Sequence, residues 1–277
     1  MSKDDNARQA RCLPSVPTTV VRILDLAQQE SCSVLSVWQV VQRDPASVLA
    51  LLLAAQRKDR HAVGAGLIGA IECLGVGKSL HVCLNFRLPD PPILPTLDYI
   101  RYWRRALLTA AYARVIARRL RSTRLEQIHA AAILHNVGDV CGGDGVEWLS
   151  VQGLAEELCL WLRLSHARTP VAAAGHDDAA ACLALAAGMA EVWLCPDWKA
   201  GLARTHAMAQ RLFGAVPDLC SWAFGVLGPQ ADDLESLARL HLPGRRECAR
   251  LYGRAELLRL RLATRHIEQD ACELSGR

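Results

Sequence analysis

The chain has 277 residues, enough for one large domain or two small ones with a sizeable buried core. Hydrophobic residues make up 51% and charged residues 22%, values that exclude a disordered or collagen-like chain. The net charge of +4 is too small to indicate nucleic-acid or membrane binding by itself. Aromatic residues are scarce at 5% while alanine and leucine are abundant, and this mixture favours helices over strands.

The 11 cysteines are scattered, and no two of them form a Cys-x-x-Cys pair. This distribution excludes a secreted disulfide scaffold and a zinc ribbon, and it favours free thiols in a reducing compartment. The first residues are polar, so we expect no signal peptide. The longest apolar run, residues 179–190, is too short to cross a bilayer. We therefore predict a cytoplasmic protein without membrane contact.

Helical periodicity begins at residues 18–30 and continues in 34–43 and 45–57, the last with Pro45 at its first position. Glycines at 64, 66 and 69 suggest a loose connection after these helices. Two short helices are then expected on either side of the turn at 74–77. The proline-rich segment 88–95 cannot lie inside a regular helix, so we interpret it as a linker.

After the linker, the pattern predicts a long amphipathic helix over 96–120 and another over 124–134. A glycine-rich turn at 138–145 precedes helices over 146–164 and 176–195. The tail is also expected to be helical, with breaks at 225–229 and 243–244. No segment alternates β-branched and polar residues as a strand would. The sequence predicts an all-α fold of two packed helical bundles, residues 1–94 and 95–277.

Three motifs occur in order along the chain. The first is Leu-Pro-Ser-Val-Pro at 13–17, followed by Asp-Pro at 44–45 ahead of a leucine-rich helix. The second is Ala-Ile-Glu-Cys-Leu-Gly at 70–75, and the third is Ile-Leu-His-Asn-Val-Gly-Asp at 133–139. Together they resemble the HDOD family, the HD-related output domain of bacterial signalling proteins, over roughly residues 13–200. The resemblance implies that the second bundle is a degenerate HD-domain-like bundle, here with Arg-rich C-terminal helices.

The wider HD phosphohydrolase superfamily holds divalent metals with a His, a His-Asp doublet and a later Asp. In this chain His135 matches the His of the doublet, but Asn136 stands where the Asp should be. The earlier His position falls on Arg105, and the later Asp position falls on Glu191. An amide carries no charge to offset a dication, and a guanidinium would repel one. We therefore predict no metal, no cofactor and no catalytic residue at these positions.

We expect a different use for the same four positions. Arg105 and Glu191 are predicted to form a partly buried ion pair, with His135 and Asn136 completing a hydrogen-bond network. Removing one member of a buried pair costs roughly 3–5 kcal/mol, because the other charge is left without a partner. The alternative is that Arg105 lies on a solvated helix face.

A second group of candidates consists of arginines. Arg114, Arg118 and Arg121 are spaced to share one helix face, and the tail after 245 is also rich in arginine. They could bind an anion or an acidic partner protein, or they could simply be a solvated face covering the core. Few aromatic residues are interleaved with them, which argues against nucleic acid.

The resemblance implies a non-catalytic signal-transduction or regulatory protein that acts through protein–protein contacts. Its partner would be a signalling protein in trans, with cyclic-di-GMP-related proteins as one candidate class. The sequence does not fix the oligomeric state. Two alternatives stay open: a metal-dependent phosphohydrolase on a nucleotide or cyclic dinucleotide, using His135 and Glu191, and a nucleotide-sensing pocket in which Arg105 clamps a phosphate.

Overall fold

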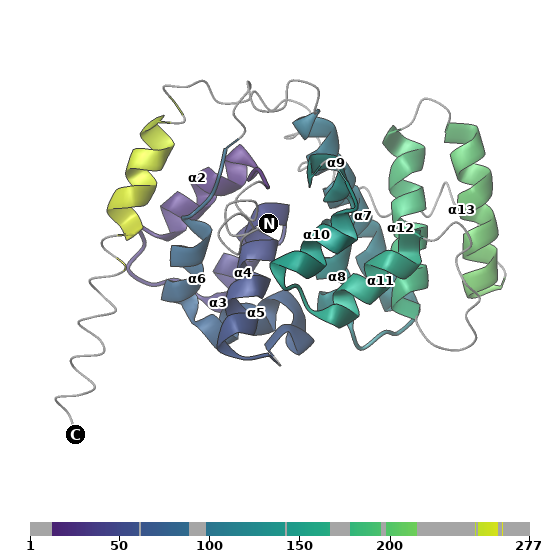
Figure 1. The fold of residues 1–277 in the computed structure, drawn as a ribbon, viewed down its shortest axis with the longest axis horizontal. Coiled ribbons are helices and arrows are strands. Elements are labelled where there is room, and N and C mark those ends of the chain that lie inside the picture. Colours follow the sequence, from purple (N-terminus) through teal and green to yellow (C-terminus); the bar gives the residue numbers. More distant parts are fainter. Residues whose placement is uncertain are drawn as a thin grey trace.

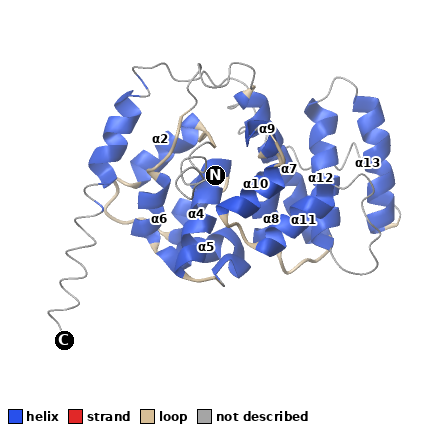
Figure 2. Cartoon of the chain, viewed as in Figure 1, coloured by secondary structure: helices blue, strands red, loops and turns tan. Residues whose placement is uncertain are grey.

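The computed structural model describes residues 13–60, 62–88, 98–141, 143–166, 178–194 and 198–214, and part of 247–262. Every regular element within these ranges is a helix, which confirms the all-α fold (Figures 1 and 2). The predicted linker at 88–95, apart from Leu88, and the predicted tail breaks lie outside the described residues. The boundary at residue 94 therefore stays a prediction.

The first group of helices precedes residue 89. Its members are α2 (Pro17–Leu26), α3 (Val34–Val41), α4 (Pro45–Lys58), the 3-10 helix η2 (Ala62–Ala65), α5 (Gly66–Leu74) and α6 (Val76–Cys83). In this group α4 is packed on α5 and α6, and α3 is packed on α2 and α5. The first helix ends four residues before its periodicity predicts. The others follow the prediction closely.

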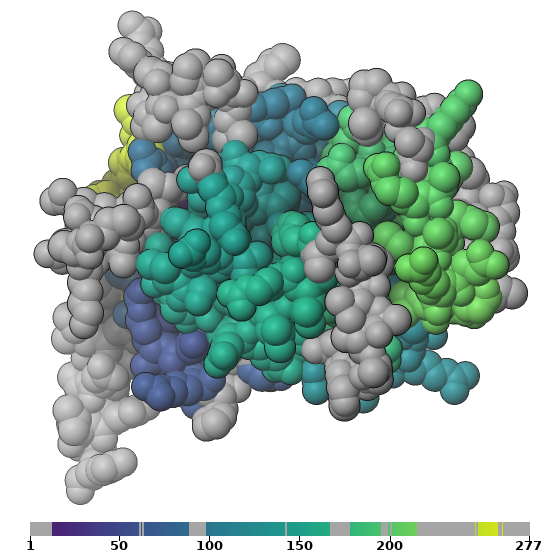
Figure 3. Space-filling view, turned by 45° about the vertical axis from the view of Figure 1, so that its right-hand side comes forward, coloured from purple at the N-terminus to yellow at the C-terminus, as the bar shows by residue number. Residues whose placement is uncertain are grey.

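The second group follows residue 98 and is built on the long helix α7. Its members are α7 (Tyr99–Arg119), α8 (Leu125–Ile133), α9 (Gly138–Cys141), α10 (Gly145–Gln152), α11 (Glu156–His166), α12 (Asp178–Leu194) and α13 (Trp198–Phe213). α12 and α8 pack on α7, and α13 packs on α12 (Figure 1). Figure 3 shows α10 and α11 in teal at the surface, between the blue first group and the green α12 and α13. The short helix α9 occupies part of the predicted turn.

The two groups share one continuous hydrophobic core. α5 packs against α8 across their junction. On α7 the indole of Trp103 is fully buried, and its Nε1 donates to the Pro14 carbonyl oxygen at 3.2 Å. The first motif of the sequence is thereby held against the second group.

Asp44 explains why that first motif and the Asp-Pro pair occur together. Its carboxylate caps α4, where Oδ2 accepts from the backbone N of Ser47 at 3.1 Å. The other oxygen accepts from the backbone N of Val16 at 3.0 Å. One fully buried side chain thus begins α4 and anchors residues 13–17.

Gly66 packs closely against α8 and is not part of a loose connection. It begins α5 at φ 69°, a left-handed conformation that favours glycine. A Cβ at this position would lie 2.5 Å from the Cβ of Glu126 on α8. The prediction of a loose connection is therefore wrong here. Glu126, which leaves no room for a side chain at this position, is distant in the sequence and gave no local signal.

α5 and α6 are separated only by Gly75, at φ 79°, and their axes are bent by 107°. Among the described helices, none is alone both long and apolar enough to cross a membrane; this bent pair meets the criterion only when its two helices are counted together.

A further helix covers residues 249–259, yellow in Figure 1, and packs back onto the first group. The ring of Tyr252 stacks on Phe86 with centroids 5.3 Å apart, and its hydroxyl accepts from the backbone N of Leu88 at 2.9 Å. Arg254 pairs with Asp25 of α2 at 3.1 Å. The Arg-rich end of the chain therefore contacts α2 and the segment that follows α6, both far earlier in the sequence.

Candidate functional site

Arg105, in the N-terminal half of α7, lies between two carboxylates. Its Nη1 donates to Asp139 Oδ2 on α9 at 3.0 Å. Its Nε lies 2.6 Å from Glu191 Oε1 on α12, although the Nε–H does not point along a hydrogen bond to that oxygen. The predicted proximity of Arg105 and Glu191 is found, and Arg105 is not a freely solvated face residue. We call Arg105, Asp139 and Glu191 the Arg105 cluster.

His135 and Asn136 lie beside the cluster but do not bond to it. Both are buried, with exposed fractions of 6% and 4%. Asn136 Nδ2 donates to the Tyr102 carbonyl oxygen at 3.1 Å, while neither ring nitrogen of His135 has a hydrogen-bond partner among the described residues. The predicted network with Arg105 and Glu191 is therefore wrong for both residues: the Asn136 amide bonds to backbone, and the His135 ring faces the ring of His166, with centroids 4.1 Å apart.

Both histidines are held neutral. Burial lowers the pKa of His135 well below its ordinary value, and the repulsion that a protonated ring would meet from His166 and from Arg105 lowers it further. Burial also lowers the pKa of His166. His166 Nε2 lies 3.1 Å from the carbonyl oxygen of His135, so this nitrogen carries the hydrogen and donates it. The two rings are therefore uncharged at neutral pH, close enough to Arg105 for its charge to lower both pKa values.

These residues do not fit a divalent metal. Among the described residues, no group of three or more His, Cys, Asp and Glu side chains is arranged to hold one. The two carboxylates that could bind a cation already bind the guanidinium of Arg105. Asn136 turns its amide toward a backbone carbonyl.

Sequence reasoning missed two members of the site. Asp139 ends the third motif, three residues after Asn136, and the short helix α9 turns it toward Arg105. His166 lies 31 residues after His135, at the end of α11. The presence of an acid within the motif was a usable signal for Asp139, whereas nothing local marks His166 as the neighbour of His135.

Comparison with known proteins agrees with this arrangement of motifs. The family model of the HDOD domain matches residues 13–196, two thirds of the chain. The chain belongs to the HDOD family. No curated protein is similar enough in sequence to match this HDOD chain.

Two crystal structures share the HDOD fold of this chain at low sequence identity. The MmoQ response regulator of Methylococcus capsulatus is 20% identical, with a TM-score of 0.61 over 76% of this chain and 96% of that one. A virulence factor of Campylobacter jejuni is 15% identical, with a TM-score of 0.59 over 83% of this chain and 96% of that one. At these identities the likeness extends to the fold alone.

The Arg105 cluster of this HDOD chain is expected to contribute less than a fully buried ion pair. The three side chains are 27%, 44% and 33% exposed. Arg105→Ala should lower the free energy of unfolding by about 1–2 kcal/mol, because it leaves two carboxylates facing a gap. The double variant with Glu191→Ala should lose less than the sum of the single losses. Urea unfolding of the wild type, the two single variants and the double variant measures this double-mutant cycle. Additive losses would show that Arg105 and Glu191 do not interact.

The three candidate arginines do not share one surface. Arg114 points into the junction of the two groups, where its Nη1 donates to Gln42 Oε1 at 2.8 Å and its guanidinium lies over the Trp38 ring at 5.1 Å. It also faces Glu126 at 3.7 Å. Arg118 is exposed on α7. Of the three, Arg114 is thus a structural contact and not an available anion site.

Arg121 lies beyond the end of α7 at φ 54°, in the position where helices commonly carry glycine. The backbone N of Ser122 donates to Ala117 O at 2.9 Å, and that of Arg121 donates to Arg118 O at 3.0 Å, which closes the helix end. Arg121→Gly should raise the free energy of unfolding by up to about 1 kcal/mol by relieving the left-handed strain. Thermal melting measures the gain; a loss in stability would show that the arginine side chain holds a stabilising contact.

His129 on α8 makes the stability of the HDOD chain depend on pH. Burial first, and the charge of Arg114 second, lower the pKa of His129 to about 4. The unfolded chain therefore takes up a proton below about pH 6.5 while the folded chain does not, so stability falls as the pH drops from 6.5 toward 4. At pH 5 this histidine alone should remove about 2 kcal/mol. Urea unfolding at pH 7.5 and 5.0 should show a smaller difference for His129→Asn, and an equal difference would contradict this assignment.

Proposed function

We propose that this HDOD chain is a non-catalytic regulatory protein that acts through contacts with a signalling protein in trans. The observation that carries the proposal is the guanidinium of Arg105 between Asp139 and Glu191. The guanidinium of Arg105 already neutralises the two carboxylates that a divalent metal would need as ligands. Because Arg105 is paired with both carboxylates, its guanidinium is not free to bind the phosphate of a nucleotide.

Membership of the HDOD family supports the signalling part of the proposal. The MmoQ protein, which shares the fold, is named a response regulator. The partner we propose is a signalling protein, with cyclic-di-GMP-related proteins as a candidate class. Among the three candidate arginines, Arg118 on α7 and Arg121 just beyond its end are exposed and could meet acidic groups on such a partner.

The test measures metal content by plasma mass spectrometry after incubation with Mn²⁺, Fe²⁺ and Zn²⁺ and removal of free metal. We expect sub-stoichiometric metal that His135→Ala leaves unchanged. Hydrolysis of a phosphodiester and of cyclic dinucleotides with Mn²⁺ should stay at the background rate. Near-stoichiometric metal that is lost in His135→Ala, or metal-dependent hydrolysis, would overturn the proposal.

A second protein provides the positive control. Arg105→His combined with Asn136→Asp restores the ligand types of the wider superfamily next to His135. If Arg105 is what excludes the metal, this variant should bind more metal than the wild type, with circular dichroism confirming that it is folded. A wild type that binds as much metal as this variant would contradict the role assigned to Arg105.

A further inference from the structure

The outer side of α3 carries an exposed leucine at the junction of the two groups. Six of the eight residues of α3 are apolar, but only Val37 and Val41 are buried. Leu35 is 58% exposed, and it is the apolar residue of α3 that does not pack on the hydrophobic core. A single exposed leucine is ordinary, so what surrounds Leu35 decides whether this face is a binding surface.

Contacts along α3 place Leu35 beside the turn that joins α7 to α8. Trp38 Nε1 donates to Glu126 Oε2 at 3.1 Å, and one helical turn later the Gln42 carbonyl oxygen lies 3.1 Å from His129 Nε2. At this contact α3 and α8 therefore advance in the same direction. Leu35, one turn before Trp38, consequently lies toward the start of α8 and the turn that precedes it.

Two exposed arginines lie at the same turn. Arg118 is in the last turn of α7 and Arg121 follows the helix end, and neither forms an ion pair with another described residue. Arg118 also lies one helical turn from Arg114. Burial lowers the pKa of Arg114, Glu126 partly opposes this, and the positive charge of Arg118 adds to the lowering. A carboxylate from a partner would offset this repulsion through a charge-assisted contact.

The side chains around Leu35 are already ordered, and they suit a protein better than a nucleic acid. Arg114 Nη1 donates to Gln42 Oε1 at 2.8 Å, and its guanidinium lies over the Trp38 ring at 5.1 Å. A partner does not have to order groups that are fixed in this way, so less of the binding free energy is lost. The ring face under Arg114 is not open to stack on a base, whereas Leu35 offers an aliphatic contact to an apolar side chain.

We propose that Leu35, Trp38, Arg118 and Arg121, the α3–α7 surface, bind an acidic amphipathic segment of a partner protein. Apolar side chains of that segment pack on Leu35 beside Trp38, and its carboxylates pair with the two arginines. Tryptophan and arginine are enriched among the residues that contribute most to protein–protein binding. The inference rests on the proposed function, because it names the surface through which the contacts with the signalling protein would be made.

The probe is a fluorescein-labelled peptide with leucines at helical spacing and glutamates at the other positions, titrated with the full chain in fluorescence anisotropy. A matched peptide carries glutamine in place of every glutamate. We expect saturable binding of the acidic peptide at one site and at least roughly tenfold weaker binding of the glutamine peptide, since charge-assisted contacts are lost. No saturable binding of the acidic peptide up to millimolar concentration, or equal binding of the two peptides, would overturn the proposal.

A labelled single-stranded oligonucleotide of the same net charge tests the other class of anionic partner. It should bind more weakly than the acidic peptide, because it lacks aliphatic side chains to pack on Leu35. Tighter binding of the oligonucleotide would show that the arginines serve a nucleic acid, and it would overturn the proposal.

Variants then locate the site. Leu35→Ser should weaken binding of the acidic peptide roughly tenfold or more, because the apolar contact is lost. Arg118→Glu combined with Arg121→Glu should weaken it at least as much, because attraction becomes repulsion. Circular dichroism checks that each variant is folded. Unchanged binding by these variants would overturn the proposal.

The matched controls lie elsewhere on the surface. Leu160→Ser changes a leucine of α11 that is 44% exposed. Arg57→Glu combined with Arg204→Glu changes the net charge as much as the α3–α7 double variant, at two other exposed arginines. Both control proteins should bind the acidic peptide as the wild type does. Equal weakening by the controls would show non-specific binding, and the proposal would fail.

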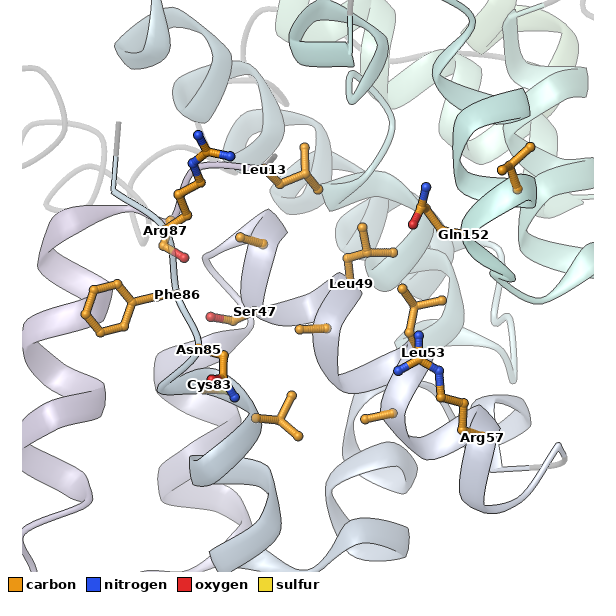
Figure 4. Close-up of a pocket in the computed structure, with 16 residues that line it drawn as sticks. Leu13, Ser47, Leu49, Leu53, Arg57, Cys83, Asn85, Phe86, Arg87 and Gln152 are labelled. Carbon is orange, nitrogen blue, oxygen red and sulfur yellow. The ribbon is translucent and has the colours of Figure 1, made fainter. Parts of the chain in front are cut away.

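A cavity of about 740 Å³ between α4, α6 and α10 is the competing place for the peptide (Figure 4). Its lining shares no residue with the α3–α7 surface. Ala50→Trp, which would fill part of the cavity, should leave peptide binding unchanged. Loss of binding in this variant, with its fold confirmed by circular dichroism, would place the peptide in the cavity and overturn the proposal.

The titration and the metal measurement separate the two proposals. A chain that binds no acidic peptide and only sub-stoichiometric metal would overturn the α3–α7 surface alone. Near-stoichiometric metal that is lost in His135→Ala would overturn the proposed function, whatever the peptide does.

Discussion

Gly66→Ala is expected to destabilise the protein by about 3 kcal/mol, from left-handed strain together with overpacking. The added Cβ would lie 2.5 Å from the Cβ of Glu126 and 2.7 Å from its carbonyl carbon. The second of these atoms is backbone, so it cannot move without shifting α8. Urea unfolding of wild type and variant measures the loss.

Gly64→Ala is the matched control for this change. Gly64 lies two residues earlier, and an added Cβ there meets no atom within 4 Å. Its substitution should change the free energy of unfolding by less than about 0.5 kcal/mol, as surface substitutions usually do. Equal losses for the two variants would contradict the effect assigned to the left-handed φ of Gly66 and its close approach to α8.

Asp44→Ala should be comparably severe, at about 3 kcal/mol, because it removes an N-cap and leaves a buried backbone donor at Val16 without an acceptor. Asp44→Asn keeps one acceptor oxygen and should lose about half as much. Asp98→Ala is the matched control, since Asp98 caps α7 in the same way, accepting from Arg101 N at 2.9 Å, but is exposed. This control should lose only about 1 kcal/mol.

Three measured free energies of unfolding decide between a local and a tertiary role for Asp44. If Asp44→Ala loses no more stability than Asp98→Ala, the hydrogen bond to Val16 contributes nothing.

Burial raises the pKa of Asp44, which opposes its ionisation in the folded state. A folded-state pKa above the unfolded value means that this group's contribution to stability decreases as the pH rises through the folded pKa. Asp44→Asn should remove that part of the acid-range pH dependence.

The helices were predictable because their signals are local. Pro45 behind a capping Asp44 marks the start of α4, and apolar residues at helical spacing mark its buried face. The long helix α7 was expected over 96–120 and lies at Tyr99–Arg119. The left-handed residues are different. Nothing next to Gly66 or Arg121 in the sequence reveals that one meets α8 and that the other closes a helix end.

The candidate site was predictable only in part, for a related reason. The proximity of Arg105 to Glu191 followed from matching motif positions of a family, which encode the three-dimensional neighbours of a site. The contact of His135 with His166 depends on where α11 ends. The contact of Asp139 with Arg105 depends on the short helix α9, which the sequence did not predict. The direction in which Arg114 points depends on the packing of α3 against α7 and α8, which periodicity along a single helix does not contain.

The hydrogen bond from Val16 to the buried carboxylate of Asp44 also has a consequence for folding dynamics. Ser15, next to it, donates to Arg87 O at 2.7 Å, and Pro14 accepts from Trp103. These partners are 28, 72 and 89 residues away, so the segment can dock only after α4, α7 and the chain after α6 are in place. In native-state hydrogen exchange, the Val16 amide should therefore exchange only when the junction of the two groups opens. Its protection factor then measures, at one residue, whether the two groups are packed together.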